Sequence, residues 1–204
     1  MVFDKEASFE EAVITVLKQH GWDDAGGVLR YPTEQDLIDN WAKILFQNNA
    51  DIDRLNGYPL TQGEMDTGHR TNRNAQDPLA LNGFINGKTV AITRDNPDDA
   101  LHLGKEVSLK IYDRQEIAAG QSRYQIAQQP VYPAKSKILN DRRGDLCLLI
   151  NGMPVSISEL KRSGIPVSQA TGQIEKYAHE GVFTGLFRLV QIFVGMTPTR
   201  RAIS

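Results

Sequence analysis

The segment that most constrains the fold of this chain covers residues 142–177, RRGDLCLLINGMPVSISELKRSGIPVSQATGQIEKY, and reads as strand, tight turn, strand, loop and helix. Its turn is Asn151-Gly152, a dipeptide typical of β-hairpins when apolar runs flank it. The flanks LCLLI and PVSI are strongly apolar. The sequence therefore predicts a buried hairpin, followed by a helix.

Three charged side chains interrupt this apolar hairpin. Period-two alternation places Asp145 on one face of the first strand and puts Glu159 and Lys161 on a common face of the second, while Leu160 points away. Burying several charges side by side costs several kcal/mol unless they are paired or hold a metal ion. We therefore expect the functional site at this end of the hairpin.

The residue types indicate a metal site. Two carboxylates, Asp145 and Glu159, are hard oxygen ligands suited to Mg²⁺, and the carbonyl oxygen of Leu160 could add a third. Such an ion acidifies a bound water and neutralises charge on a phosphodiester, with Lys161 beside that water. The alternative is that Glu159 and Lys161 form part of an ordinary charged ladder on a solvated sheet face.

The following helix adds a polar stripe. Ser168 is expected to cap it and Gly181 to end it. Gln169, Gln173 and Tyr177 are spaced at four-residue intervals and therefore share one face of the helix. That face either meets solvent or, next to the carboxylates, donates hydrogen bonds to DNA.

These motifs together resemble a known nuclease family. Asp145 followed by Glu159-Leu160-Lys161 resembles the PD-(D/E)xK signature, and Gln173 with Tyr177 resembles the Gln-xxx-Tyr element of one nuclease branch. The amino-acid sequence of the hairpin is similar to that of the amino-terminal nuclease domain of the type I restriction enzyme R (restriction/translocase) subunit. The segments SRYQIAQQ (122–129), GLFRLVQIFVGMTPT (185–199) and FEEAVITVLKQHGW (9–22) extend the resemblance. Gly144 departs from the family, which usually has proline there.

The resemblance implies a Mg²⁺-dependent endonuclease, with Mn²⁺ as a possible substitute, that hydrolyses double-stranded DNA. Asp145, Glu159 and Lys161 are the implied catalytic residues, and Asp145, Glu159 and the Leu160 carbonyl the implied metal ligands. Gln173 and Tyr177 would contact DNA. Glu10 on the first helix would be an accessory acid, although Glu11 competes for that role and either could be a solvated first-turn acid.

The same resemblance implies partners. The family joins this domain to a helicase-like translocase in one polypeptide, and it works with modification (M) and specificity (S) subunits. The 204 residues would then form a single nuclease domain (1–204), with its catalytic core at about 122–199, excised from the N-terminus of a longer protein. ATP would act only in the adjoining translocase, because Gly87-Lys88-Thr89 lacks the first glycine of a phosphate-binding loop: Asn82 stands there.

Composition fits an intracellular DNA-binding protein. Residues 135–204 contain ten Lys and Arg against five Asp and Glu, whereas the whole chain has a formal net charge of −2. The basic part is thus the part that holds the proposed site, as a phosphate-binding surface requires. A single cysteine, Cys147, excludes an internal disulfide and suits the cytoplasm. No apolar run is long enough to span a membrane.

The remaining pattern completes an α/β chain. Residues 6–20 predict an amphipathic helix with Phe9, Val13, Val16 and Leu17 inward, and Thr33 begins a second helix whose Trp41 belongs to the core. Strands are expected at 88–94, 107–112, 124–129 and 186–194.

We therefore expect a restriction-endonuclease-like core, with a mixed central sheet flanked by helices. Two other functions stay open. The chain could be a PD-(D/E)xK nuclease of another defence or repair system. It could also be a non-catalytic DNA-binding module that retains the fold.

Overall fold

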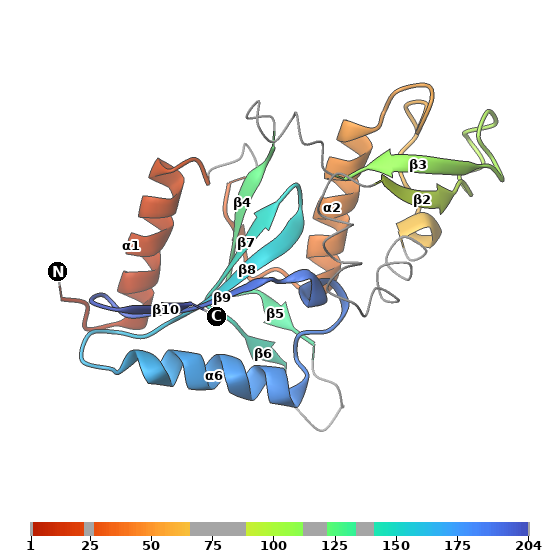
Figure 1. Cartoon of the computed structure of the whole chain (residues 1–204). Coiled ribbons are helices and arrows are strands. Elements are labelled where there is room, and N and C mark those ends of the chain that lie inside the picture. Colours follow the sequence, from red (N-terminus) through yellow and green to blue (C-terminus); the bar gives the residue numbers. More distant parts are fainter. Residues whose placement is uncertain (1, 23–26, 66–88, 112–121, 134–140, 204) are drawn as a thin grey trace. The chain divides into compact units, whose positions relative to one another are not determined.

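The chain folds around a six-stranded mixed sheet with helices against it (Figure 1). The computed structural model describes residues 2–22, 27–65, 89–111, 122–133 and 141–203. The strand order is β1-β4-β7-β8-β9-β10. These strands are Leu29–Arg30, Tyr124–Gln128, Leu146–Ile150, Met153–Leu160, Ile192–Met196 and Arg201–Ile203. The expected α/β class with a mixed central sheet is confirmed, and the arrangement is consistent with a restriction-endonuclease-like core.

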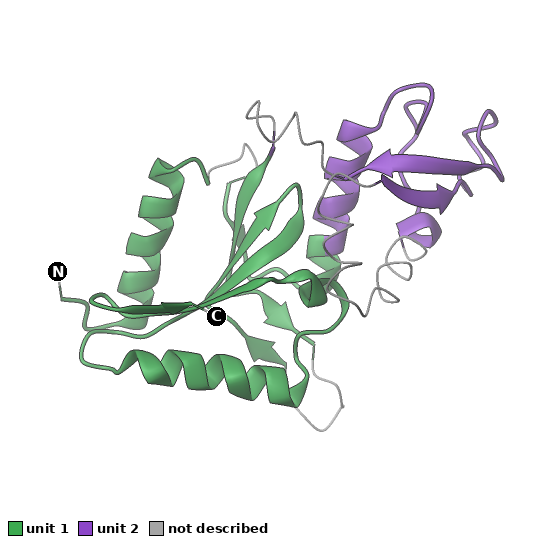
Figure 2. Cartoon of the chain, viewed as in Figure 1, with its two compact units in different colours: residues 1–37, 123–204 green, residues 38–122 purple. Residues whose placement is uncertain are grey.

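The chain divides into two compact units (Figure 2). Unit 1 joins residues 1–37 to residues 123–204, and unit 2 is the intervening stretch 38–122. The predicted single domain and its core at about 122–199 stay predictions. All the predicted site residues fall in unit 1.

The central hairpin is formed by β7 and β8. Asn151 and Gly152 have φ of 51° and 82°, as a two-residue hairpin turn with positive φ at both positions requires. Cys147 pairs with Ile157, and the register shifts between Leu148 and Leu149. The predicted hairpin is confirmed, and the alternation of faces holds up to that irregularity.

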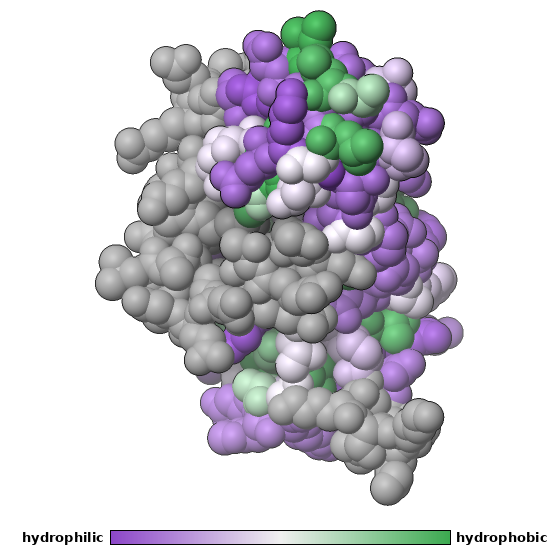
Figure 3. Space-filling model, turned by 90° about the vertical axis from the view of Figure 1, so that its right-hand side faces the viewer, coloured by the Kyte–Doolittle hydropathy of each residue, from purple (hydrophilic) through white to green (hydrophobic). Residues whose placement is uncertain are grey.

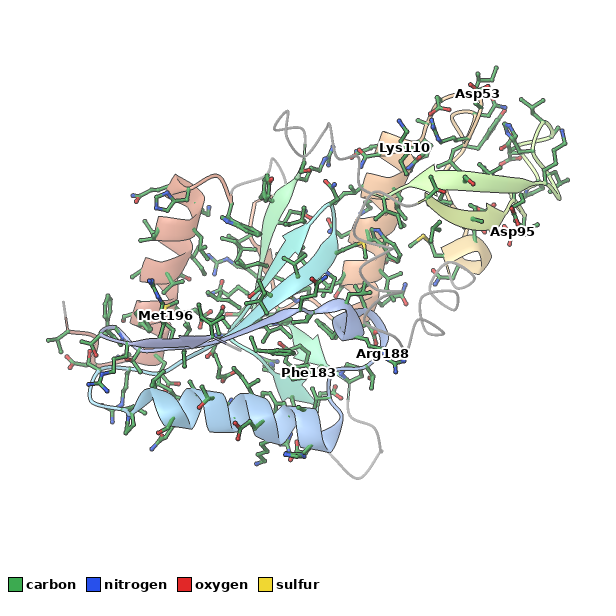
Figure 4. The ribbon with its side chains drawn as sticks, viewed as in Figure 1. Asp53, Asp95, Lys110, Phe183, Arg188 and Met196 are labelled. Atoms are coloured by element: carbon green, nitrogen blue, oxygen red, sulfur yellow. The ribbon has the colours of Figure 1, made fainter. Side chains whose placement is uncertain are left out.

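Helix α1 (Glu6–Gln19) packs on the sheet through an apolar cluster. The buried members of this cluster are Phe9, Ile14, Ile126, Leu146 and Leu160. Met196 on β9, labelled in Figure 4, packs against the same cluster. One predicted inward residue is wrong: Val16 is 51% exposed, because the helix turns Ile14 to the sheet instead.

Helix α6 (Val167–Glu180) packs against β8, β9 and β10. It ends at Gly181 in the left-handed conformation, as predicted. The predicted cap at Ser168 is wrong. Pro166 occupies the N-cap, where its fixed φ suits the approach to a helix, and no described side chain forms a capping hydrogen bond there.

Aromatic side chains fill the space beside α6. Tyr132 of β5 (Val131–Tyr132) is fully buried and meets Tyr177, Phe183 and Phe187 edge-on. Phe183 lies between α6 and the short ladder of β5 and β6 (Arg142–Arg143), as Figure 4 shows. Tyr132 packs closely against the backbone at Gly144. A Cβ at that position would lie 2.3 Å from the hydroxyl oxygen of Tyr132.

The strand predicted at 186–194 is wrong in position. Residues Gly185–Leu189 form a 3₁₀ helix, η1, and the strand β9 begins only at Ile192. The turn is held by the main-chain N–H of Leu186, which donates to Glu34 Oε1 over 2.7 Å. A continuous apolar run does not reveal such a break.

Unit 2 contains most of helix α2 (Glu34–Asn48) and a two-stranded ladder, β2 (Thr89–Thr93) with β3 (Glu106–Lys110). The second helix begins after Thr33, as predicted, and Thr33 and Asp36 cap it reciprocally. Trp41 is buried as predicted, with 1% of its surface exposed. Residues 66–88, which include Gly87 and Lys88 of the Gly87-Lys88-Thr89 segment, lie outside the described part of the chain.

The coloured part of the surface in Figure 3 is mainly hydrophilic, with small separate apolar areas. Within the described ranges, no helix is long and apolar enough to cross a membrane.

Candidate nuclease site

The predicted site residues meet at the ends of β7 and β8. Asp145 directly precedes β7. Glu159 is the last residue but one of β8, and Lys161 directly follows that strand. Extending the register that pairs Leu146 with Ser158 by one residue puts Asp145 opposite Glu159. Leu160 points the other way, into the cluster under α1, as alternation requires.

Three contacts position the charged side chains of this site. The Leu160 main-chain N–H donates to Asp145 Oδ2 over 2.6 Å. Lys161 Nζ lies 3.6 Å from Glu159 Oε1 and 3.9 Å from Glu6 Oε1. The ammonium group therefore lies between an acid of the sheet and an acid of α1, with 14% of its side chain exposed.

One carboxylate oxygen in this site has no hydrogen-bond partner among the described residues. Glu159 is 1% exposed, and its buried Oε2 receives no hydrogen bond from that part of the chain. Leaving such an oxygen unpaired is costly, and a bound cation would satisfy it. This orphaned atom is the feature of the structure that best fits a divalent ion.

The surroundings of both acids disfavour their charged forms. Burial raises the pKa of Asp145 to about 6, although the Leu160 N–H and Lys161 oppose the rise. Burial, together with the neighbouring charge of Asp145, raises the pKa of Glu159 to about 8. Two acids whose charged forms are disfavoured without a cation are suited to holding one.

The fit to a metal ion rests on these two side chains. No group of three or more His, Cys, Asp or Glu side chains is arranged to hold a metal within the described ranges. Asp145 and Glu159 would thus be the side-chain ligands, and the Leu160 carbonyl, between Glu159 and Lys161 in the chain, stays a predicted third.

Helix α1 presents Glu10 rather than Glu11 to the interior. Glu10 is 3% exposed and accepts hydrogen bonds from Gln128 Nε2 at 2.6 Å and Gln129 Nε2 at 3.2 Å. The charge of Glu10 also raises the pKa of Asp145, so the two acids are close enough to interact. Glu11 instead pairs with Arg30 at the surface, and its side chain is 53% exposed. The reading of Glu10 as a solvated acid is therefore wrong.

Gln128, Gln129 and Glu6 belong to this site although the sequence did not single them out. Gln129 also donates its main-chain N–H to the carbonyl of Asp145 over 2.7 Å, and its own φ is 50°. The sequence did contain a signal, because two adjacent glutamines at the end of a strand can donate hydrogen bonds to a buried carboxylate. That carboxylate, Glu10, lies more than a hundred residues away in the chain, so the sequence does not identify it as their partner.

The Gln-xxx-Tyr element supports the chain in front of Asp145. Gln173 Nε2 donates to the Tyr177 hydroxyl over 2.9 Å, and that hydroxyl donates to the carbonyl of Arg143 over 3.2 Å. Tyr177 is 8% exposed, so only the start of the predicted stripe, Gln169 and Gln173, reaches the surface. An open pocket of about 490 Å³ adjoins it, lined by Arg142, Gln169, Gly172, Gln173, Lys176 and Tyr177.

Fold and site together define a class of protein: an α/β domain with an Asp…Glu-x-Lys constellation at the end of a central hairpin. Residues 4–197 match the family model described as the type I restriction enzyme R protein N terminus. The chain belongs to this family.

Similar proteins are type I restriction enzyme endonuclease subunits. One from Staphylococcus saprophyticus is 32% identical over 198 residues, which are 95% of this chain and 18% of that protein. One from Staphylococcus aureus strain MSSA476 is 28% identical over 198 residues, with the same coverage of 95% and 18%. The chain thus spans 18% of the length of these curated relatives.

Proposed function

We propose that this chain is the nuclease domain of a type I restriction–modification R subunit and hydrolyses double-stranded DNA in a Mg²⁺-dependent reaction. The observation that carries the proposal is the meeting of Asp145, Glu159 and Lys161 around an unpaired, buried carboxylate oxygen. Membership of the R protein N-terminal family and the names of the relatives support the same conclusion.

Asp145 and Glu159 would hold the cation, with the Leu160 carbonyl as a further oxygen. A bound Mg²⁺, or Mn²⁺ in its place, supplies Lewis acidity towards the phosphodiester and an acidified water. The chain prepares for this by fixing Asp145 Oδ2 on the Leu160 N–H, while Oε2 of Glu159, which has no hydrogen-bond partner among the described residues, is available to the ion.

Lys161 would orient the attacking water and stabilise negative charge on the phosphate in the transition state. Its ammonium group is a mobile point charge with three donors, which suits both tasks. Glu159 and Glu6, at 3.6 Å and 3.9 Å, hold the group near the metal ligands.

The remaining predicted residues would position the metal ligands without binding the metal ion themselves. Tyr177, with Gln173, holds the Arg143 carbonyl and so fixes the approach to Asp145. Glu10 adds negative charge beside Asp145, and the amides of Gln128 and Gln129 fix its position.

The proposal includes the substrate, the partners and the cellular location that are typical of the family. The substrate is double-stranded DNA, and the translocase domains of the same polypeptide would consume ATP. Modification and specificity subunits would supply sequence recognition, and the assembly would work in the cytoplasm, where the single cysteine stays reduced.

The direct test is Mn²⁺-dependent nicking of plasmid DNA by the wild-type chain and by Lys161→Ala. Nicking is expected in the first and absent in the second. Lys18→Ala is the matched control: it removes one lysine from the far end of α1, about 18 Å along the helix from Glu6.

In the complete enzyme, Asp145→Ala, Glu159→Ala and Lys161→Ala should each abolish cutting and spare ATP-driven translocation. Cutting that persists in all three refutes the assignment. A non-catalytic module would show no Asp145-dependent binding of Mn²⁺ in calorimetry, and a nuclease of another system would lack helicase motifs downstream in its gene.

A further inference from the structure

An exposed aromatic residue beside the site is held in an unusual backbone conformation. Tyr31 directly follows β1 and has φ of 55°, a region that residues other than glycine rarely adopt. Its side chain is not used in the core, since Tyr31 is 51% exposed. Residues kept in such conformations concentrate at functional sites, because elsewhere the strain serves no purpose.

The guanidinium group of Arg143 lies over this ring. Its Cζ is 5.7 Å from the ring centroid of Tyr31, within the range of a cation–π contact. Arg143 is exposed and forms no ion pair with a carboxylate in the part of the chain that the structure describes. Its neighbour Arg142, by contrast, is paired with Glu180 through two hydrogen bonds.

Main-chain hydrogen bonds connect this pair to the catalytic strand. The N–H of Tyr31 donates to the carbonyl of Gln128 over 2.8 Å, and the N–H of Gln129 donates to the carbonyl of Asp145 over 2.7 Å. Arg143 precedes Asp145 by two residues, so their Cα atoms are at most about 7 Å apart.

We propose that Arg143, held in place by the ring of Tyr31, binds a DNA backbone phosphate next to the one that is cut. The pair is called the Tyr31–Arg143 rim. This inference rests on the proposed nuclease function and adds a substrate-positioning contact to it.

The chemistry favours a phosphate as the ligand of the rim. A guanidinium group offers a planar fork of donors that matches phosphate oxygens, and stacking on an aromatic ring leaves the edge of that fork free. The ring also limits the rotamers of Arg143, which lowers the entropic cost of binding. Fixing a phosphate one or two nucleotides from the cut would set the register of the strand against Asp145, Glu159 and Lys161.

The rim can be tested by DNA binding without cleavage. The 204-residue chain carrying Asp145→Ala is titrated against a short fluorescein-labelled duplex in EDTA, and the anisotropy gives Kd over a range of NaCl concentrations. Adding Arg143→Ala should weaken binding about tenfold and reduce the slope of log K against log salt by about 0.9, the value for one phosphate. Arg143→Lys should keep the slope and lose part of the affinity.

Two variants of Tyr31 separate the ring from the backbone. Tyr31→Gly accepts the positive φ and removes the ring, so the fold should persist while binding weakens several-fold. Tyr31→Phe keeps the ring and should bind like the parent. The proposed phosphate contact is overturned if Arg143→Ala leaves the slope of log K against log salt unchanged. It is also overturned if Tyr31→Gly and Tyr31→Phe bind DNA with equal affinity.

The two proposals fail separately. The binding assay contains no metal and uses a background that cannot cut, so an unchanged slope overturns the rim alone. Cutting that persists in Asp145→Ala, Glu159→Ala and Lys161→Ala overturns the proposed function and leaves the phosphate contact to be judged by its own salt slope.

Discussion

The main-chain N–H of Leu160 donates to Oδ2 of Asp145 over 2.6 Å, so one metal-ligand candidate is positioned by the β8 strand that carries the other. Glu159 precedes that N–H by one residue, and its Oε2 is buried without a hydrogen-bond partner in the described ranges. The hairpin therefore fixes both acids at once, and it does so at a cost in stability that a bound cation would offset.

Glu159→Gln should stabilise the metal-free chain and destroy metal-dependent cutting. The amide removes a buried acid that is costly beside Asp145, because it must either take up a proton or carry an unfavourable charge, and we expect a gain of about 1 kcal/mol in the free energy of unfolding. Thermal unfolding with and without Mn²⁺ tests this, because the variant should lose the stabilisation that the metal gives to the wild type. A variant that is less stable than the wild type without metal would contradict the burial argument.

Stability of the metal-free chain should fall as the pH rises. Folded Asp145 and Glu159 titrate at about 6 and about 8, above their ordinary values of 3.8 and 4.5. Between the ordinary and the raised pKa values, the folded chain binds more protons than the unfolded chain. Deprotonation in this pH range therefore favours unfolding. The loss should begin near pH 4 and be complete above about pH 8.

Thermal midpoints in EDTA from pH 4 to pH 9 measure this loss. The double variant Asp145→Asn/Glu159→Gln is the control, and its profile should be flatter over the same range. A wild-type profile that rises from pH 5 to pH 8 would contradict the assigned directions of both pKa shifts.

Tyr177→Phe tests whether the helix supports the strand before Asp145. The change removes the hydroxyl that joins Gln173 to the Arg143 carbonyl and should cost roughly 1 kcal/mol of stability. We expect cutting to fall more than Mn²⁺ affinity, because the ligands stay in place while the approach to them loosens. Lys176→Ala, on the exposed side of α6, should change neither quantity by a comparable amount.

Local signals made much of this fold predictable. Asn151-Gly152 set the hairpin turn, Gly181 ended α6, and alternation along β7 and β8 separated Glu159 from Leu160. Each of these depends on the conformation of a few neighbouring residues, which a sequence records directly.

Contacts between distant segments were not predictable in the same way. The apolar run at 186–194 breaks into η1 and β9, and a side chain from α2, Glu34, holds the Leu186 N–H. Glu10 is buried because Gln128 and Gln129 provide amide donors. Neither partner lies near in sequence, so periodicity could not choose Glu10 over Glu11.

Gly144 and Tyr132 should be coupled. A Cβ at position 144 would lie 2.3 Å from the hydroxyl oxygen of Tyr132 and 2.9 Å from two ring carbons, so Gly144→Ala should cost roughly 1–3 kcal/mol. Tyr132→Phe removes a buried hydroxyl that has no hydrogen-bond partner within the described ranges, and should be neutral or stabilising by about 1 kcal/mol.

Chemical denaturation of both single variants and the double variant measures the coupling. The double variant should recover part of the cost of Gly144→Ala, because the closest contact is gone while the ring contacts remain. Strict additivity would show that the packing of Tyr132 on Gly144 does not set the cost.

Arg94 should be the residue on which unit 2 most depends. Its guanidinium group is fully buried and binds Glu64 Oε2 at 2.6 Å and Asp99 Oδ2 at 3.1 Å. It also donates to the carbonyl of Tyr58 at 3.2 Å. Arg94→Met would leave two buried carboxylates without their cation, and we expect a loss of roughly 3–5 kcal/mol.

Arg54→Ala is the matched control in the same unit, since it removes an arginine from a surface pair with Asp51 that should contribute less than about 1 kcal/mol. Urea unfolding of the wild type and the two variants gives the comparison, with hydrogen exchange of the β2 and β3 amides reporting on unit 2 alone. If Arg94→Met costs no more than Arg54→Ala, the carboxylates must take up protons when the cation is lost, and the difference should then reappear at high pH.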